Sequence, residues 1–282
     1  MEWGGGRRSG NIEDRRGLGP VGVAGGGIGA VVLAIIGYFV FGVPPETTMN
    51  AVNGAQQPAA QEGARGQVTD QEGQFIDVVE TSNDDVWGPV LARHNIKYTP
   101  PEAVVLYDQS TATGCGTGQS AMGPFYCPAD HKVYLDLAFW KELETRFGAK
   151  GEFARAYVIS HEIGHHVQTL TGASDQAQRM GARGAESGSV RLELQADCYA
   201  GVWAKHAPEA SGGKIAINRA DIEDGLGAAA AVGDDAIQEQ TQGRVMPDSF
   251  THGSSAQRMK WFGKGYDAGD PGACDTFSAG TL

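Results

Sequence analysis

One stretch of the sequence constrains the fold more than any other, because residues 156–168 place three polar side chains inside an apolar pattern. His161, Glu162 and His165 form a His-Glu-x-x-His motif in this stretch. Residues four apart on an α-helix lie about 40° apart around its axis, so the two imidazoles point the same way. Apolar residues at helical spacing flank the motif on most sides, which predicts a buried helix that ends near Gly172.

Two imidazoles and a carboxylate on a buried helix need polar partners, and a metal ion can supply them. Histidines on adjacent helical turns can hold one Zn²⁺. Glu162 lies about 100° away around the axis, where it can reach a metal-bound water instead of the metal. The alternative is a surface helix with two solvated histidines. The apolar flanks argue against that alternative, so we predict that His161 and His165 bind zinc.

A third protein ligand is needed, because a catalytic zinc site usually has three and keeps one position open. The downstream candidates are Glu186, Glu193, Asp197, His206 and His252. Glu193 and Asp197 lie four residues apart on one face of a predicted helix, among apolar neighbours that argue against a solvated acidic face. We predict that Glu193 is the third ligand. Asp197 then accepts a hydrogen bond from a ligand histidine and fixes its tautomer.

Charge and apolar content bound the class of protein. The 282 residues carry a net charge of −12 and no basic stripe, which argues against nucleic-acid binding. An apolar fraction of 41% is enough for a core in one large or two small domains.

The four cysteines allow two disulfides. Cys115 and Cys127 close a loop rich in Gly and Pro, so we pair these two and leave Cys198 with Cys274. Free buried thiols and metal ligands remain alternatives, and disulfides require an oxidising compartment.

An apolar segment near the N-terminus predicts membrane attachment. Residues 21–43 contain no charge and would span about 34 Å as a helix, enough for a bilayer core. Arginines precede this segment and none follows closely, which predicts a cytoplasmic segment at residues 1–20 and an uncleaved transmembrane anchor. A cleaved signal peptide is the alternative, although the segment is long for one and lacks a small-x-small cleavage site. Residues 44–69 are predicted to be a flexible linker before a folded domain at residues 70–282.

Within this domain the pattern predicts an α+β fold, mostly helical with a small sheet. The expected elements are helices at 69–92, 137–147, 190–207, 220–231 and 254–262, strands at 103–107 and 132–137, and loops at 114–128 and 171–189. Pro208 is expected to end the helix at 190–207, and Asn218 is expected to cap the helix at 220–231.

Two of these motifs together resemble a known class of enzyme. His161-Glu-Ile-Gly-His165 with Glu193-Leu-Gln-Ala-Asp197 is similar to the zincin metallopeptidases with a glutamate ligand, including the membrane-associated Ste24/HtpX-like peptidases. Thr251-His252-Gly253, followed by Arg258, resembles a later Thr-His segment of those enzymes, although Gly replaces their usual Pro. The resemblance implies that Glu193 is a ligand and that Asp197 supports a histidine.

A closer resemblance is to the bacterial family of neutral zinc metallopeptidases with one N-terminal anchor. It covers nearly the whole chain. Besides the Arg-flanked start and the two metal motifs, it is carried by Gly123-Pro-Phe-Tyr-Cys-Pro128, Val133-Tyr-Leu-Asp136, Gly233-Asp-Asp235, and Phe250-Thr-His-Gly253 to Trp261-Phe262. It implies a zincin-like domain that binds Zn²⁺ and acts on a protein or peptide substrate.

The combined hypothesis is a membrane-anchored zinc metallopeptidase. Glu162 accepts the proton of a zinc-bound water that attacks a peptide carbonyl, and His252, by analogy, stabilises the oxyanion. The strand around 133–135 would pair with an extended substrate. We expect a single-pass protein of the bacterial inner membrane, with its catalytic domain on the periplasmic or extracytoplasmic side.

Two other functions stay open at this point. The protein could be a catalytically silent zinc-binding scaffold or partner protein of the envelope, although the intact Glu162 argues against it. Hydrolysis of a non-peptide amide is a third hypothesis, because zinc–water chemistry does not select the substrate. His252 has a structural alternative as a helix-capping or core histidine.

Overall fold

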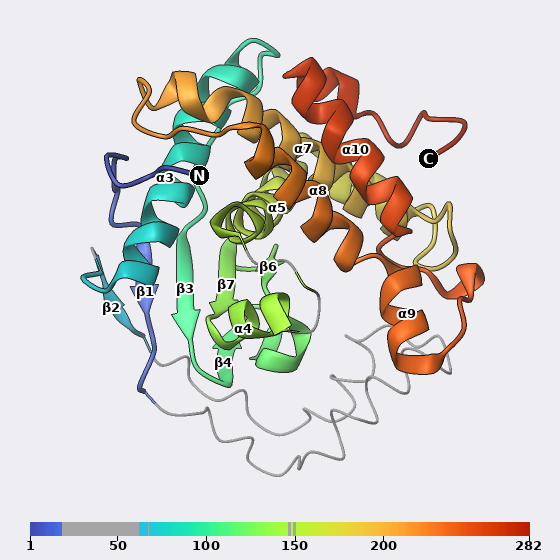
Figure 1. The fold of residues 1–282 in the computed structure, drawn as a ribbon, viewed down its shortest axis with the longest axis horizontal. Helices are drawn as coiled ribbons and strands as arrows, with labels where there is room; N and C mark the ends of the chain where they lie inside the picture. Colours follow the sequence, from blue (N-terminus) through green and yellow to red (C-terminus); the bar gives the residue numbers. More distant parts are fainter. Residues whose placement is uncertain (19–61, 67, 146–147, 149–150) are drawn as a thin grey trace.

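A mixed five-stranded sheet carries a layer of helices in the computed structural model, which describes residues 1–18, 62–66, 68–145, 148 and 151–282 (Figure 1). The strand order is β2-β1-β3-β7-β6. The central strands β1, β3 and β7 run parallel, and the edge strands β2 and β6 are antiparallel to their neighbours. The strands are β1 (Ile12–Asp14), β2 (Ala64–Arg65), β3 (Ala103–Tyr107), β6 (Phe125–Cys127) and β7 (Lys132–Asp136), with a separate hairpin of β4 (Ser110–Thr113) and β5 (Gly116–Gln119).

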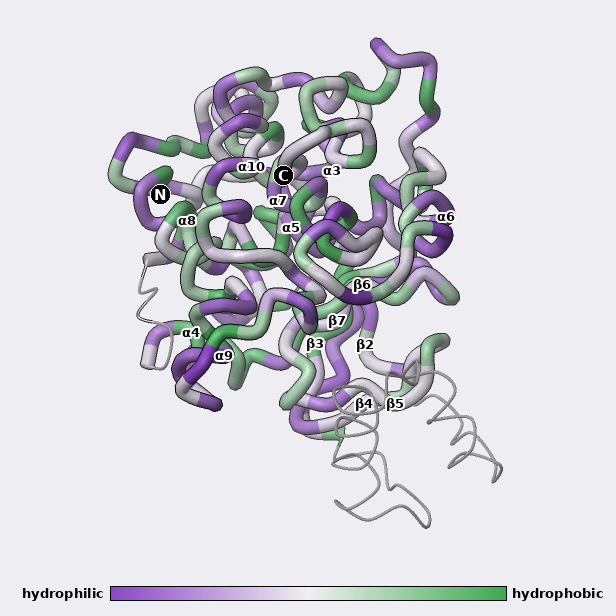
Figure 2. Tube along the Cα trace, turned by 90° about the vertical axis from the view of Figure 1, so that its right-hand side faces the viewer, coloured by the Kyte–Doolittle hydropathy of each residue, from purple (hydrophilic) through white to green (hydrophobic). Residues whose placement is uncertain are grey.

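Helices cover one face of the sheet, and α5 lies between the sheet and helices α7, α8 and α10 (Figure 1). Hydrophobic segments gather around α5 and the central strands, as Figure 2 shows. The helices are α3 (Gln71–Ala92), α4 (Ala138–Thr145), α5 (Glu152–Thr171), α6 (Ala173–Gln178), α7 (Gly188–Ala210), α8 (Arg219–Ala231), α9 (Asp234–Gln242) and α10 (Ser255–Ala268).

The alternation of side chains along β3 explains how a fully buried strand serves two cores. Val104 and Leu106 pack with the helices in the main core, whereas Val105 and Tyr107 join a smaller cluster on the opposite face. Successive side chains of a strand point to opposite faces, so both faces of β3 are covered. The strand therefore reads as a continuous apolar run in the sequence.

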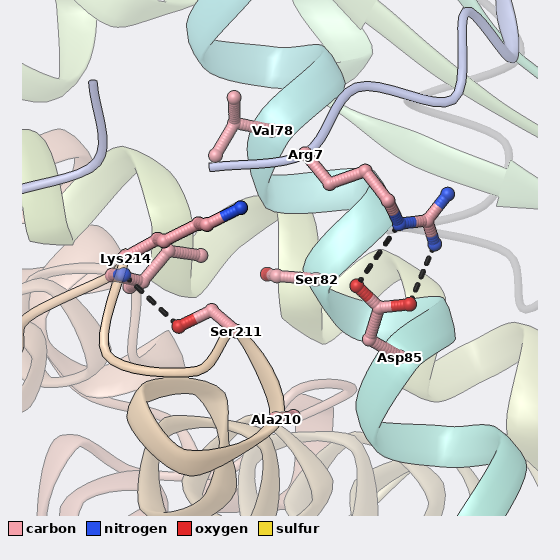
Figure 3. Close-up of a pocket in the computed structure, with 8 residues that line it drawn as sticks. Arg7, Val78, Ser82, Asp85, Ala210, Ser211 and Lys214 are labelled. Atoms are coloured by element: carbon pink, nitrogen blue, oxygen red, sulfur yellow. Dashed lines mark hydrogen bonds and ion pairs between the residues drawn. The ribbon is translucent and has the colours of Figure 1, made fainter. Parts of the chain in front are cut away.

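The N-terminal segment, residues 1–18, is part of this folded body. Strand β1 lies between β2 and β3, and the backbone of Glu2 pairs with that of Ala216 at 2.9 Å. Arg7 forms an ion pair with Asp85 on α3, where it borders a cavity of about 320 Å³ between the segment, α3 and the end of α7 (Figure 3).

This arrangement differs from the predicted division of the chain, which set residues 1–20 apart as a cytoplasmic segment. Strand β1 pairs with β3, so residues 1–18 belong to the same folded body as the described part of 62–282. The predicted orientation across a bilayer stays a prediction. Sequence patterns missed β1 because only Ile12 is apolar in its three residues.

The predicted anchor at 21–43 and most of the predicted linker at 44–69 lie outside the described residues. Two residues of that linker, Ala64–Arg65, form strand β2. Among the described residues, none of the helices combines the length and the apolar character needed to span a bilayer.

Both predicted disulfides are confirmed. Cys115 pairs with Cys127, and Cys198 on α7 pairs with Cys274 near the C-terminus. The second bridge holds the C-terminal tail against α7. Free thiols and cysteine metal ligands are thereby excluded.

Most predicted helices and strands are present, with specific corrections. The predicted loops at 114–128 and 171–189 contain β5, β6 and α6. Pro208 does not end α7, which continues to Ala210, because a proline in the last turn removes only one helical hydrogen bond. Val133 and Tyr134 are paired on both sides, so the expectation that this strand binds substrate is wrong. The exposed edge of the sheet on that side is β6.

Candidate metal centre

The site forms where α5 and α7 approach each other closely. Gly164 makes this approach possible, because a side chain in its place would lie 3.2 Å from the Cα of Ala196 on α7. Ala196 lies in the same helical turn as Glu193 and Asp197. The close crossing therefore brings the two carboxylates of α7 against the histidines of α5.

Three predicted ligands converge at this crossing. Nε2 of His161 lies 3.2 Å from Oε2 of Glu193, and Nε2 of His165 lies 3.5 Å from Oε1 of the same carboxylate. One donor atom from each of the three residues falls within 4.8 Å of the others. His161 is buried, and the other two side chains are mostly shielded from solvent.

The other nitrogen of each ring is fixed by a neighbouring side chain. Nδ1 of His161 lies 2.9 Å from Oδ1 of Asp197, and Nδ1 of His165 lies 2.8 Å from Oε1 of Gln168. An oxygen partner at Nδ1 favours a proton there and leaves the lone pair of Nε2 facing the cluster. Two imidazole nitrogens and a carboxylate are a donor set that suits zinc, so the residues present fit this metal.

Asp197 is itself held by a buried network. Arg258 on α10 donates to both oxygens of Asp197 at 2.9 Å, and the hydroxyl of Tyr157 also donates to it. Burial raises the pKa of Asp197, but the charge of Arg258 and the hydrogen bond from His161 outweigh burial and lower the pKa to about 2. The carboxylate is therefore charged, which strengthens its hydrogen bond with His161.

The electrostatic field of the cluster favours positive charge. Burial lowers the pKa of His161, but the hydrogen bond and charge of Asp197, with help from Glu193, raise it to about 10. The pKa of Glu193 lies well below its usual value, because the two histidines outweigh its burial. A cation between these side chains is thus strongly stabilised.

Glu162 has a different environment from the two carboxylates of α7. Its side chain is buried on α5, and burial raises its pKa to about 7 against the opposing charge of His161. A backbone hydrogen bond from Tyr126 on the edge strand β6 also acts on this carboxylate. A carboxyl group with a pKa near 7 can both accept and release a proton at neutral pH.

His252 lies beside the cluster, outside the set of three ligands. Its side chain is half exposed, and Nδ1 lies 2.8 Å from Oγ1 of Thr251 and 3.3 Å from Oδ1 of Asp234. Burial of the ring lowers its pKa, but the hydrogen bond that it donates to Asp234 and the charge of Glu193 raise it overall. The effect of the Glu193 charge on this pKa indicates that His252 lies near the third ligand.

The remaining candidates do not join the site. Glu186 is exposed in the turn before α7, and His206 bonds through Nε2 to the carbonyl oxygen of Gly269. His166 bonds to Thr99 and Tyr126, which gives it a structural role.

Sequence reasoning missed three contributors to the site: Gln168, Tyr157 and Asp234. The spacing of Gln168 from His165, three residues along one helix, could have identified it. Tyr157 lies one turn before His161 and offered a similar signal. Asp234 is brought to His252 only by the tertiary fold.

Comparison with known proteins gives a consistent picture. The sequence model of the family described as "Putative neutral zinc metallopeptidase" matches residues 1–277. "Uncharacterized protein YpfJ" of Escherichia coli (strain K12) is 42% identical over 98% of this chain and 99% of its own length. "Uncharacterized protein Rv2575" of Mycobacterium tuberculosis (strain H37Rv) is 51% identical over 73% of this chain and 71% of its own. No solved structure was found to match.

Proposed function

The chain belongs to this family of neutral zinc metallopeptidases, and from that premise we propose that it hydrolyses peptide bonds with a zinc ion held by His161, His165 and Glu193. One observation carries the proposal. Glu162 is buried on α5 between the two ligand histidines in sequence, and it is not itself one of the three residues that could hold the metal. A purely structural zinc site has no use for such a group, because structural sites are closed by protein ligands.

The metal supplies Lewis-acid chemistry when bound, because it lowers the pKa of a coordinated water and polarises a carbonyl group. The protein residues do the rest. Glu162 takes up a proton from the attacking water and delivers it to the amine nitrogen that leaves. Asp197 and Gln168 hold the two ligand rings in one tautomer and orientation. His252 donates from its ring to the carbonyl oxygen as negative charge develops there.

An extended peptide is the substrate conformation that suits this site. Strand β6 is the edge of the sheet next to α5, and its Tyr126 backbone contacts Glu162. An unpaired strand edge can bind a peptide through main-chain hydrogen bonds. We propose that the substrate backbone runs along β6, which positions the scissile bond over the metal cluster.

The direct test of the proposed reaction is Glu162→Gln, with Glu186→Gln as a matched control. Glu186 is an exposed carboxylate that lies outside the cluster. We expect both variants to retain zinc, whereas hydrolysis of a casein-type substrate falls at least about 100-fold in Glu162→Gln alone. Equal turnover by Glu162→Gln and the wild-type protein would contradict the mechanism. A wild-type protein that binds zinc but cleaves nothing would favour a silent scaffold.

We also propose that the domain works in an oxidising compartment outside the cytoplasm, because it contains two disulfides. The membrane anchor stays a prediction from the sequence. Cysteines placed at Gly4 and Gly227, two positions with open space around them, provide the test. An impermeant maleimide applied to intact spheroplasts should label both positions equally. Labelling of one position without the other, or of neither, would contradict this placement.

A further inference from the structure

The loop that carries His252 is built around a single carboxylate, that of Asp234 at the start of α9. Oδ2 of Asp234 accepts hydrogen bonds from the backbone N–H groups of Thr251 at 2.7 Å, His252 at 2.6 Å and Gly253 at 2.9 Å. The backbone N–H of Asp234 donates in return to the carbonyl oxygen of Gly253 at 2.9 Å. One side chain thus fixes three consecutive peptide groups.

The same carboxylate also reaches the imidazole. Oδ1 of Asp234 lies 3.3 Å from Nδ1 of His252, and Oγ1 of Thr251 lies 2.8 Å from that nitrogen. Asp234 is largely buried, with 11% of its side chain exposed, whereas half of the His252 side chain is exposed. Nε2 of His252 has no protein partner in the part of the chain that the structure describes, so it is available to a substrate.

The loop is also pressed against the helix that carries the third ligand. Ser189 on α7 donates to the carbonyl oxygen of Thr251 at 2.8 Å. A side chain at Gly253 would lie 3.1 Å from Leu194, the residue after Glu193, and Gly253 has a φ of +89° that favours glycine. The loop that carries His252 is therefore held against α7, next to the residue that carries the third ligand.

We propose that Asp234 is a positioning residue for the reaction: it fixes both the backbone and the ring of His252, so that Nε2 donates to the substrate carbonyl oxygen. This inference rests on the proposed peptidase function. It assigns to Asp234 a role that differs from that of its neighbour. Asp235 bonds instead to the backbone and hydroxyl of Ser255, and it does not contact His252.

The charges around His252 are consistent with a donor. Asp234 from α9 and Glu193 from α7 favour the protonated ring, and Arg258 from α10 opposes it. The balance raises the pKa of His252. A protonated imidazole carries hydrogens on both nitrogens, so Nδ1 can donate to Asp234 while Nε2 donates to substrate.

The experiment compares Asp234→Asn with the adjacent control Asp235→Asn in the full chain loaded with zinc. We expect Asp234→Asn to lower kcat about 100-fold with KM changed less than about threefold, because a donor to the oxyanion acts in the transition state. Zinc content should not change, and Asp235→Asn should keep kcat within about threefold. The double variant Asp234→Asn/His252→Gln should be no slower than His252→Gln alone, because Asp234 acts through His252. Losses that multiply in the double variant, or equal losses in the two aspartate variants, would overturn the proposal.

A second readout does not depend on turnover. The ¹⁵N spectrum of histidine-labelled protein, with His252 assigned by its loss in His252→Gln, reports the hydrogens on its ring. We expect Nδ1 to carry a hydrogen in the wild-type protein at pH 7 and this preference to disappear in Asp234→Asn. A wild-type ring protonated only at Nε2 would overturn the proposal even if Asp234→Asn did not fold. If the wild-type protein showed the expected ring but cleaved no peptide, the proposed function would fail and the positioning contact would stand.

Discussion

Helices α3 and α7 each carry a pair of shielded carboxyl groups, and the charge of each pair is reduced in a different way. On α3, Glu80 and Asp84 receive hydrogen bonds from Ser9, Asn11 and Tyr98, and neither forms an ion pair with a described residue. Burial raises the pKa of Glu80, with the charge of Asp84 adding to it, and burial likewise raises the pKa of Asp84.

On α7, Glu193 and Asp197 face two histidines and Arg258, and the pKa of each falls below its usual value despite burial. This difference separates carboxylates that could bind a metal ion from carboxylates that only hold two segments of the chain together. At neutral pH the α3 pair keeps one proton, on Glu80, and this pair fastens the N-terminal segment to the domain. Cationic side chains neutralise the α7 pair, and the geometry leaves room for one more cation.

The largest expected effect comes from removing the fixed cation of the α7 group. Arg258→Met leaves Asp197 buried with His161 and Tyr157 as its remaining polar partners. We expect a loss of about 3–5 kcal/mol in the free energy of unfolding at pH 7, measured with urea. Arg219→Met is the control, because its ion pair with Glu223 is exposed and is worth less than about 1 kcal/mol. Similar losses in the two variants would show that Arg258 contributes no more to stability than an exposed ion pair does.

An intermediate effect, dependent on pH, is expected at the α3 group. Glu80 ionises near its ordinary pKa of 4.5 in the unfolded chain and near 8 in the folded one. The stability that Glu80 contributes is therefore fully present below about pH 4.5 and is lost as the pH rises to 8. Between these values the folded state binds one more proton than the unfolded state, so stability falls as the pH rises. Glu80→Gln should unfold with nearly wild-type stability at pH 4.5 and be more stable than wild type by up to about 5 kcal/mol at pH 8.5.

Urea denaturation of both proteins across this pH range measures the difference. The control Glu223→Gln replaces an exposed carboxylate and should show no such trend. A stability difference between Glu80→Gln and wild type that is the same at pH 4.5 and 8.5 would show that Glu80 is ionised in the fold.

The smallest effect compares two tyrosines in matching places. Tyr157 donates to Asp197, and Tyr98 donates to Asp84 at 2.6 Å. A hydrogen bond to a fixed carboxylate is worth about 1.5–3 kcal/mol, whereas one to a group that can take up a proton is worth about 1 kcal/mol. Tyr157→Phe should therefore destabilise the protein more than Tyr98→Phe at pH 6, by thermal or urea unfolding. The reverse order would place the fixed charge on α3.

The sequence predicted the parts of the site that depend on helical geometry. His161 and His165 are one turn apart on α5, and Glu193 and Asp197 are one turn apart on α7, so local spacing determines which side chains share a face. The pairing of the two helices could be inferred only from chemistry, because buried imidazoles need a partner. The close approach at Gly164 is visible only in the fold.

The remaining features depend on contacts between distant segments. The strand β1 is polar and three residues long, and its place in the sheet comes from pairing with β3, about ninety positions later in the chain. Helix α9 was missed because its nine residues are mostly polar and Ile237 alone is strongly apolar. Asp234 begins that helix, so its contact with His252 could not be predicted either.

Zinc-edge anomalous diffraction from crystals of the zinc-loaded protein tests the central claim most directly. The structure predicts one anomalous peak per chain at the α5–α7 crossing, in contact with Nε2 of His161, Nε2 of His165 and a carboxylate oxygen of Glu193. No peak at this crossing, or a peak whose ligands exclude Glu193, would contradict the proposed metal centre.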